Sequence, residues 1–300
     1  MSIGGSGPHG EVDPDSAAPV VSSRGSRMLG SRAVLVSTAS TIFFFGALAL
    51  IVALSPGAQL VGERFLSIED LVQSLQGTDT SPSVLGAFWL NVRIFLVAEI
   101  VILVFALLIA IVRSIPGPVF FPFRLVAIGY VDFFRGVPLI LLIYMIGFGV
   151  PGLGLQFFSN QTPVVYGTVA LILVYSAYVA EVYRAGIDSV HESQVAAGRS
   201  LGLTRWQSLR FVVLPQAIRR VIPPLLNDFI GLQKDTALIS VLGPIEAARA
   251  AFIYSAENFN YAPYIVASLL FVLVTIPLAR FTDRLIARDR SRRAATGGVR

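Results

Sequence analysis

The sequence predicts an all-α polytopic membrane protein with six transmembrane helices. Hydrophobic residues make up 55% of the 300-residue chain, whereas charged residues make up only 14%. Six apolar segments approach or exceed the length of about twenty residues that a helix needs to cross a bilayer. The arginines also gather in alternate connecting segments. This combination is typical of a chain that crosses a membrane several times.

The predicted spans alternate with arginine-rich and arginine-poor connections. Eighteen arginines fall in segments 1–32, 113–124, 184–220 and 280–300, whereas segments 56–85, 148–163 and 244–261 hold only Arg64 and Arg249. Because cytoplasmic loops carry the excess of positive charge, the first group, with both termini, is predicted to be cytoplasmic. The six spans are 33–54, 86–112, 124–147, 164–183, 216–243 and 262–280.

The two ends of the chain differ from its middle in composition. Residues 1–32 are rich in Gly, Ser, Pro and Asp, which predicts a disordered cytoplasmic tail. Residues 33–85 comprise the first span and a polar outer loop. A cleaved signal peptide is the alternative for that span, but the run is long for a signal core, which favours an uncleaved helix. Residues 286–300 predict a basic cytoplasmic tail.

Charged side chains are few inside the predicted spans, and an unpaired one costs on the order of 2.5–3.5 kcal/mol in hydrocarbon. They therefore indicate surfaces that face the interior of the bundle or an aqueous path. Asp228, Gly231 and Asp235 share one stripe of a helix, and Asn227 and Lys234 share the neighbouring stripe. The ionisable residues concerned are Arg93, Glu99, Asp132, Arg135, Glu181, Asp228, Lys234 and Asp235.

The alternative for these charges is that they pair with one another and only hold the bundle together. Asp132 precedes Arg135 by three residues, which favours a local salt bridge. Glu181 lies close to Arg184 at the end of its span and favours an interfacial ion pair.

Prolines predict breaks in two spans. Gly136-Val137-Pro138 follows Arg135 and should loosen the helix there, so that this side chain turns inward. Pro215, Pro223 and Pro224 predict a bent or partly unwound fifth span, and broken helices in transporters commonly lie beside the solute path. Ile245–Tyr254 is predicted to form a short amphipathic helix at the outer surface.

The polar segment 185–215 predicts a docking element for another protein. Its small and polar residues from Ser193 to Leu201 can form a short helix, which Gly202 should end. Thr204 and Gln207 have the spacing of a capping box for the next helix. The residues expected to contact the partner are Gln194, Ala196, Ala197, Gly198, Gly202, Leu214 and Pro215.

This segment resembles the cytoplasmic loop of the membrane subunits of ABC importers, whose pattern is E-A-A, three residues, G, nine residues, I-x-L-P. Ala196-Ala197-Gly198 is followed by Gly202 and then by Val212-Val213-Leu214-Pro215, so the spacing is kept. The family glutamate is Ala196 here, and the second alanine is Gly198. Further motifs, at 134–138, 177–181, 223–227 and 234–236, are similar to those of the polar amino-acid permeases of this superfamily.

The resemblance implies a five-helix permease core at residues 86–285, to which the first span is an N-terminal addition. It implies a permease subunit that translocates polar amino acids, glutamate or a related one, across the cytoplasmic membrane. A dimer of cytoplasmic ATPases, a second permease subunit (identical or homologous) and an extracytoplasmic substrate-binding protein are the implied partners. A zwitterionic solute needs a cation for its carboxylate and an anion or amide for its ammonium, which Arg135, Asp228, Asp235 and Asn227 could supply.

Other functions lack their motifs. Lys234 is the only lysine and no phosphate-binding loop surrounds it, so ATP must be hydrolysed by a partner and no cofactor is expected. The chain has no cysteine, and His9 and His191 lack partners at metal-ligand spacing, which argues against a metal site. Nothing indicates nucleic-acid binding. The rival function is an ATP-independent secondary amino-acid transporter or channel that uses the charges within the membrane.

Overall fold

The structure is a computed structural model, and it describes residues 31–115, 117–154 and 156–297. Within these residues every regular element is a helix, which confirms the predicted all-α class. All but the last two residues of the expected disordered tail, 1–32, lie outside the described residues. The chain forms two units, residues 1–60 and 61–300, which are described separately.

The first unit contains one long helix, α1 (Ser31–Ala53). Its segment Val34–Ala53 has a mean hydropathy of 2.2 and holds no ionisable residue, so it is long and apolar enough to cross a membrane. A helix therefore forms where the first span, 33–54, was predicted. The short helix α2 (Ala58–Phe65) follows at the boundary of the units.

Four helices of the described chain can each cross a membrane alone, and two bent pairs raise the count to as many as six. The single helices are α1, α4 (Val84–Ser114), α9 (Pro163–Asp188) and α14 (Ala262–Gly297). One bent pair joins α5 (Phe121–Gly136) to Leu139–Gly152 at 108°, and the other joins Trp206–Leu242 to α13 (Ala247–Asn258) at 51°. The predicted spans 124–147 and 216–243 are thus not single straight helices.

The break after α5 follows from the sequence Gly136-Val137-Pro138. Val137 has φ −96° and ψ 133°, the extended conformation that a residue before proline prefers. Pro138 cannot donate a backbone hydrogen bond to continue α5, and α6 (Leu139–Tyr144) starts directly after it. The π-helix η2 (Met145–Gly149), α7 (Val150–Gly152) and α8 (Gln156–Ser159) complete this excursion.

The fifth predicted span changes its helical winding beside Pro215 and again after Asp235, but not at Pro223 or Pro224. The π-helix η3 (Leu209–Val213) precedes α12 (Leu214–Asp235), and the 3-10 helix η4 (Thr236–Leu242) follows it. Pro223 and Pro224 lie inside α12, which continues through both. The predicted bend therefore lies at residues 243–246, between η4 and α13.

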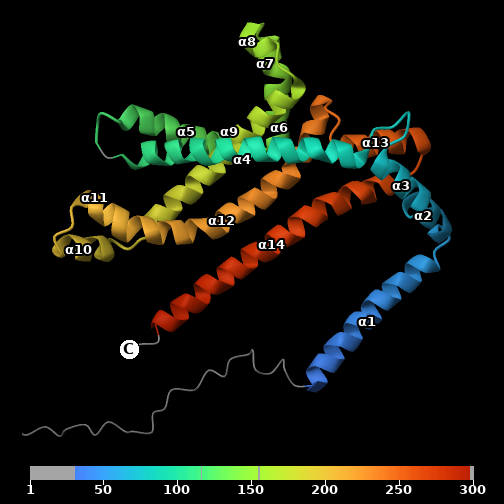
Figure 1. The fold of residues 1–300 in the computed structure, drawn as a ribbon, viewed down its shortest axis with the longest axis horizontal. Coiled ribbons are helices and arrows are strands. Elements are labelled where there is room, and N and C mark those ends of the chain that lie inside the picture. The colour runs from blue at the N-terminus through green and yellow to red at the C-terminus, as the bar shows by residue number, and fades with distance from the viewer. Residues whose placement is uncertain (1–30, 116, 155, 298–300) are drawn as a thin grey trace, which may run out of the picture. The chain divides into compact units, whose positions relative to one another are not determined.

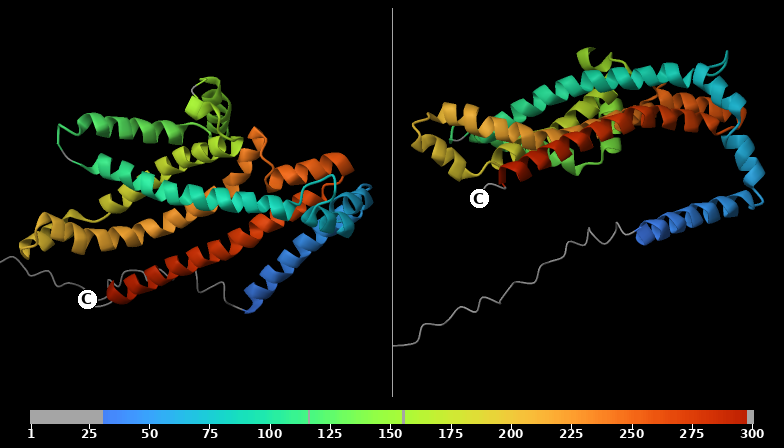
Figure 2. Two further views of the ribbon diagram at one scale, coloured as in Figure 1. Left: turned by 45° about the horizontal axis from the view of Figure 1, so that its top comes forward. Right: turned by 60° about the horizontal axis from the view of Figure 1, so that its bottom comes forward.

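The second unit is a bundle in which α4 and α12 both pack along α9, while α14 packs against α12 (Figures 1 and 2). Its largest core cluster includes Ile102, Val131, Leu171 and Leu232, contributed by α4, α5, α9 and α12. The short helices α10 (Glu192–Ser200) and α11 (Arg205–Ser208) lie at one end of the bundle, whereas α3 (Ile68–Gln76) and α13 lie at the other (Figure 1).

The segment 56–85, which was expected to be an outer loop, contains the helix α3 at the α13 end of the bundle. Asp70 of α3 accepts hydrogen bonds from Tyr254 Oη at 2.9 Å and from Asn260 Nδ2 at 2.7 Å. Arg64 Nη1 donates to the carbonyl of Phe259 at 2.7 Å. The loop prediction for 56–85 missed these elements because their polar residues have partners far away in the sequence.

The buried carboxylate of Glu246 fixes the start of α13. It is 0% exposed and accepts hydrogen bonds from Asn91 Nδ2 at 3.0 Å and from the backbone N–H groups of Ala248 and Arg249 at 2.9 and 2.7 Å. The short helix expected over 245–254 is present as α13, and one of its faces, with Ala250 and Tyr254, is buried.

Replacing Gly186 by alanine should destabilise the contact between α9 and α12. An added Cβ would overlap Val221 Cγ2 and lie 3.4 Å from the Ala217 carbonyl oxygen. Overpacking of this kind costs about 1–3 kcal/mol, so the purified protein should melt at a lower temperature in detergent.

The matched control is Gly129→Ala in α5, whose added Cβ meets no atom within 4 Å. This substitution should be neutral or slightly stabilising, because alanine favours a helix over glycine by about 1 kcal/mol. Equal melting temperatures for the two variants would contradict the close packing of α9 on α12.

Candidate functional site

A polar cavity of about 400 Å³ lies between the break after α5 and the helices α9 and α12. Its volume falls within the range of roughly 300–1,000 Å³ that is usual for small-molecule sites. Three of the residues predicted to bind solute share its wall. The lining residues are Arg135, Gly136, Val137, Pro138, Leu139, Val174, Tyr175, Tyr178, Asp228 and Asp235.

Arg135 is placed by the last turn of α5 and by the chain break that follows it. Tyr130, five residues earlier, donates from its hydroxyl to the carbonyl of Leu173 at 2.6 Å, which holds α5 against α9. The Arg135 guanidinium lies 5.6 Å from the centre of the Tyr178 ring, within cation–π distance. Its side chain is 40% exposed, so its donors remain accessible from the cavity.

The two carboxylates of the cavity come from one face of α12, as their spacing predicted. Asp235 Oδ2 accepts a hydrogen bond from the Tyr175 hydroxyl at 2.7 Å. Gly231, between the two acids, leaves room for this tyrosine, because a Cβ there would lie 3.0 Å from its hydroxyl oxygen. Asp228 Oδ2 is buried and has no hydrogen-bond partner among the described residues. An ammonium group in the cavity would satisfy this acceptor.

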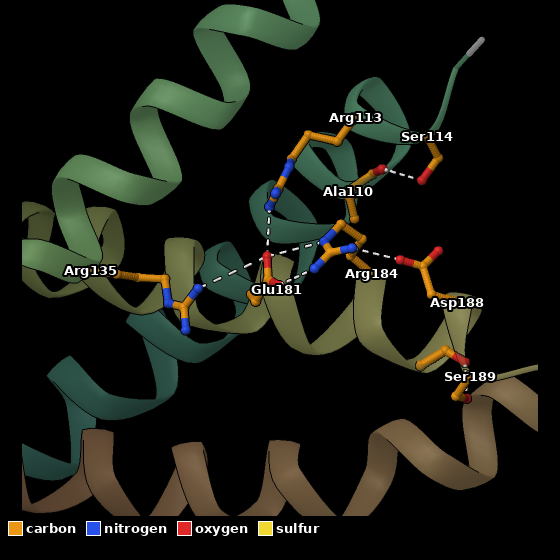
Figure 3. A network of polar contacts seen from close by, with 9 residues as sticks. Ala110, Arg113, Ser114, Arg135, Glu181, Arg184, Asp188 and Ser189 are labelled. Carbon is orange, nitrogen blue, oxygen red and sulfur yellow. Dashed lines mark hydrogen bonds and ion pairs between the residues drawn. The ribbon is translucent and has the colours of Figure 1, made fainter.

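Glu181 lies one turn after Tyr178 on α9 and forms the centre of an ion-pair network (Figure 3). Arg113 Nη1 at the end of α4 is 2.8 Å from Glu181 Oε2, and Arg184 contacts both oxygens of the carboxylate. Arg135 Nη1 is 4.0 Å from the same Oε2 atom. Glu181 thus joins α4, α5 and α9, and the ion pair expected with Arg184 is present.

Some sequence expectations differ from this geometry. Asn227 is exposed and is not among the described residues that line the cavity, so it does not share the site with Asp228. Asp132 is exposed and makes no ion pair within the described chain, whereas Arg135 lies 4.0 Å from Glu181. Sequence reasoning also missed Tyr175 and Tyr178 as cavity residues. Their i, i+3 spacing just before Glu181 was the available signal.

Chemically, the cavity presents one guanidinium and two carboxylates within a largely apolar bundle. Arg135 and Asp228 line the same cavity, so groups of opposite charge share its wall. A guanidinium can bind a carboxylate through two parallel hydrogen bonds, whereas carboxylates accept from an ammonium. The arrangement can therefore hold a small zwitterion in one orientation.

A second candidate surface, the α10–α11 surface, consists of exposed residues of the short helices at the opposite end from α13. Leu201 is 85% exposed and Trp206 is 76% exposed, although both are apolar. Gln194, Ala196 and Ala197 are also exposed, as are Gly202 and the first two residues of α12, Leu214 and Pro215. Small side chains on α10 allow a close approach by another protein.

The predicted local signals shape this surface. Gly202 has φ +84° and follows the end of α10, where the Leu203 N–H donates to the Gly198 carbonyl at 3.2 Å. Thr204 and Gln207 form the capping box, with bonds of 2.9 Å and 3.3 Å. Gly198 alone among the expected contact residues is buried, against Ser208. The docking role of the remaining residues stays a prediction.

Comparisons with known proteins show which family the chain resembles. Residues 103–291 match the family described as binding-protein-dependent transport system inner membrane component. The probable glutamine ABC transporter permease protein GlnM of Bacillus subtilis is 38% identical over 162 residues, which cover 54% of this chain and 73% of that protein. The glutamate transport system permease protein GluC of Corynebacterium glutamicum is 30% identical over 224 residues, which cover 70% and 97%.

Solved structures show the same architecture. A crystal structure of an amino acid ABC transporter with histidines superposes with a TM-score of 0.63 at 30% identity, covering 68% of this chain and 93% of that chain. The inward-facing MetNI methionine ABC transporter has a TM-score of 0.54 at 20% identity, covering 68% and 95%, and supports the fold alone. Because the family match spans more than half of the sequence, the chain belongs to the inner membrane components of binding-protein-dependent transport systems.

Proposed function

We propose that this multi-pass membrane protein is the permease subunit of an ATP-driven ABC importer and carries polar amino acids across the cytoplasmic membrane. Its family comprises membrane components, so ATP hydrolysis belongs to a partner subunit. Relatives are named as permeases for glutamine, glutamate and arginine. These solutes share an α-carboxylate and an α-ammonium and differ in their side chains.

The observation that carries the proposal is the cavity whose wall includes Arg135, Asp228 and Asp235. In this proposal, Arg135 binds the α-carboxylate of the solute, and the unpartnered oxygen of Asp228 accepts from its ammonium. Asp235, already bound by Tyr175, supplies a second negative charge. In this proposal the cavity binds the α-carboxylate and the α-ammonium, which all amino acids share, and the side chain of the solute extends beyond the cavity.

We further propose that two cytoplasmic ATPases bind the α10–α11 surface of this chain and of a second permease subunit, identical or homologous. An extracytoplasmic binding protein delivers solute at the α13 end. When the ATPases close, α10 and η3 move and α12 moves with them. Because α12 carries both acids of the cavity, its movement changes the side from which solute reaches Arg135.

Arg135→Gln should weaken amino-acid binding by about tenfold or more. The substitution removes a charge-assisted hydrogen bond, worth about 1.5–3 kcal/mol, and tenfold corresponds to about 1.4 kcal/mol. Equilibrium binding of radiolabelled L-glutamine, L-glutamate and L-arginine to the permease–ATPase complex in lipid nanodiscs measures the effect. Asp228→Asn should also weaken binding.

The matched control is Asp132→Asn, which removes a charge one turn from Arg135 on the exposed side of α5. Its affinity should equal that of the unmodified protein. Unchanged affinity in both Arg135→Gln and Asp228→Asn would show that the solute does not bind in this cavity.

Leu201→Asp should abolish copurification of the ATPase from native membranes and the stimulation of uptake by ATP. The side chain is 85% exposed, so the substitution leaves the fold intact and places a charge where an apolar contact is expected. Val119→Asp, at a residue 77% exposed in the connection between α4 and α5, is the control and should retain the ATPase. If the unmodified protein carries no ATPase and ATP does not stimulate uptake, the ATP-independent transporter is favoured.

The proposed orientation, with both termini and the α10–α11 surface in the cytoplasm, can be tested with single cysteines, since the chain has none. In sealed right-side-out vesicles, a membrane-impermeant maleimide should label Asp79→Cys but not Ser200→Cys. Both residues are exposed, so both should react once the membrane is opened. Labelling of Ser200→Cys but not of Asp79→Cys would show that the protein has the opposite orientation in the membrane.

A further inference from the structure

Three arginines, Arg113, Arg184 and Arg135, lie at different distances from the Glu181 carboxylate (Figure 3). Its Oε2 atom lies 2.8 Å from Arg113 Nη1 and 3.2 Å from Arg184 Nε, whereas Arg135 Nη1 is 4.0 Å away. The first two contacts are hydrogen bonds, and the third is beyond hydrogen-bond distance. The carboxylate is therefore already occupied on the side that Arg135 faces.

The three arginines also differ in the alternatives open to them. The Arg113 side chain is only 11% exposed, so it depends on Glu181 for its charge partner. Arg184 is held on two sides, because its Nη1 is also 2.6 Å from Asp188 Oδ2. Arg135 is 40% exposed and lies over Tyr178 at the wall of the cavity. Of these three arginines, Arg135 is thus the one that lines the cavity.

We infer that Arg113 is a positioning residue for solute binding. By occupying Glu181, it prevents this carboxylate from drawing Arg135 away from the cavity. Without Arg113, Oε2 would gain a free lone pair 4.0 Å from the Arg135 guanidinium, a gap that a small side-chain rotation closes. A solute carboxylate would then have to compete with Glu181. The inference rests on the proposed function, in which Arg135 binds that carboxylate.

The mechanism makes opposite predictions for the two members of the Arg113–Glu181 pair. Arg113→Gln leaves the competing carboxylate in place and should weaken binding. Glu181→Gln removes the competitor and should leave the affinity equal to or higher than that of the unmodified protein. The double variant has neither the competitor nor an unpaired buried arginine, so binding should recover. If Arg113 only supported the fold, the double variant would bind no better than Arg113→Gln.

The test is equilibrium binding of radiolabelled L-glutamine, L-glutamate and L-arginine to the permease–ATPase complex in nanodiscs, without the binding protein. For the amino acids that the unmodified complex binds, Arg113→Gln should raise Kd about tenfold, the effect of losing one charge-assisted contact. The double variant should return to within about threefold of the original Kd. Arg93→Gln is the control on the same helix, since Arg93 is exposed and has no ion pair within the described chain.

Each outcome decides between the proposals. If the unmodified complex binds none of the three amino acids, the proposed solute site and this inference both fall. If it binds them and Arg113→Gln binds equally well, the role of Arg113 is overturned while the solute site stands. Failure of the double variant to recover also overturns the inference. Should Arg113→Gln not fold, Glu181→Gln decides, because weaker binding there contradicts competition for Arg135.

Discussion

The need to pair ionised side chains inside an apolar bundle governs the arrangement of this protein. A charge left alone in hydrocarbon is costly, so each one must meet an opposite charge, a hydrogen-bond donor or water. Glu181 meets the requirement with arginines from α4, α5 and α9. The polar cavity lies beside this junction, because Arg135 lines the cavity and lies 4.0 Å from Glu181.

Helix geometry then brings the cavity and the α10–α11 surface into one continuous structure. The acids of the cavity lie on α12, which η3 connects to α11 without a loop. At the other face of α12, Gly186 allows α9 to approach Val221 closely. α10 contacts η3, and η3 continues directly into α12, so helices in contact join the α10–α11 surface to Asp228. No long flexible connection lies between the two sites.

The sequence was most informative where a physical rule acts over a few residues. Gly202, the Thr204–Gln207 capping box and the Gly136-Pro138 break depend on local backbone chemistry, and each appears where it was predicted. The stripe that joins Asp228 to Asp235 follows from helical periodicity, so these acids could be grouped in advance. No such local rule predicts contacts between helices that are distant in the sequence. The contact between Glu181 and Arg113, 68 residues apart, could therefore not be predicted from their spacing.

The same limit explains the misplaced bend of the fifth span. Pro223 and Pro224 predicted a break because each removes a backbone donor. Neighbouring helices can compensate for such a loss, and α12 continues through both residues. The bend lies instead beside Glu246, whose buried carboxylate needs donors and finds them in Asn91 and the first N–H groups of α13. The hydrogen bonds of this buried carboxyl group hold the chain at the bend.

Two half-buried or buried carboxylates, Glu246 and Glu181, thus stabilise the two ends of the bundle by different means. Glu246 is bound by neutral donors, two of them backbone N–H groups whose positions are fixed by the helix that they begin. Glu181 is bound by long arginine side chains that can exchange partners. An exchange from Arg113 to Arg135 would keep the carboxylate paired, but it would leave the Arg113 side chain, only 11% exposed, without its charge partner. Breaking the Glu246 contacts would leave a buried charge without donors. The contacts at the α13 end are therefore fixed by the backbone, whereas those at Glu181 depend on side-chain conformation.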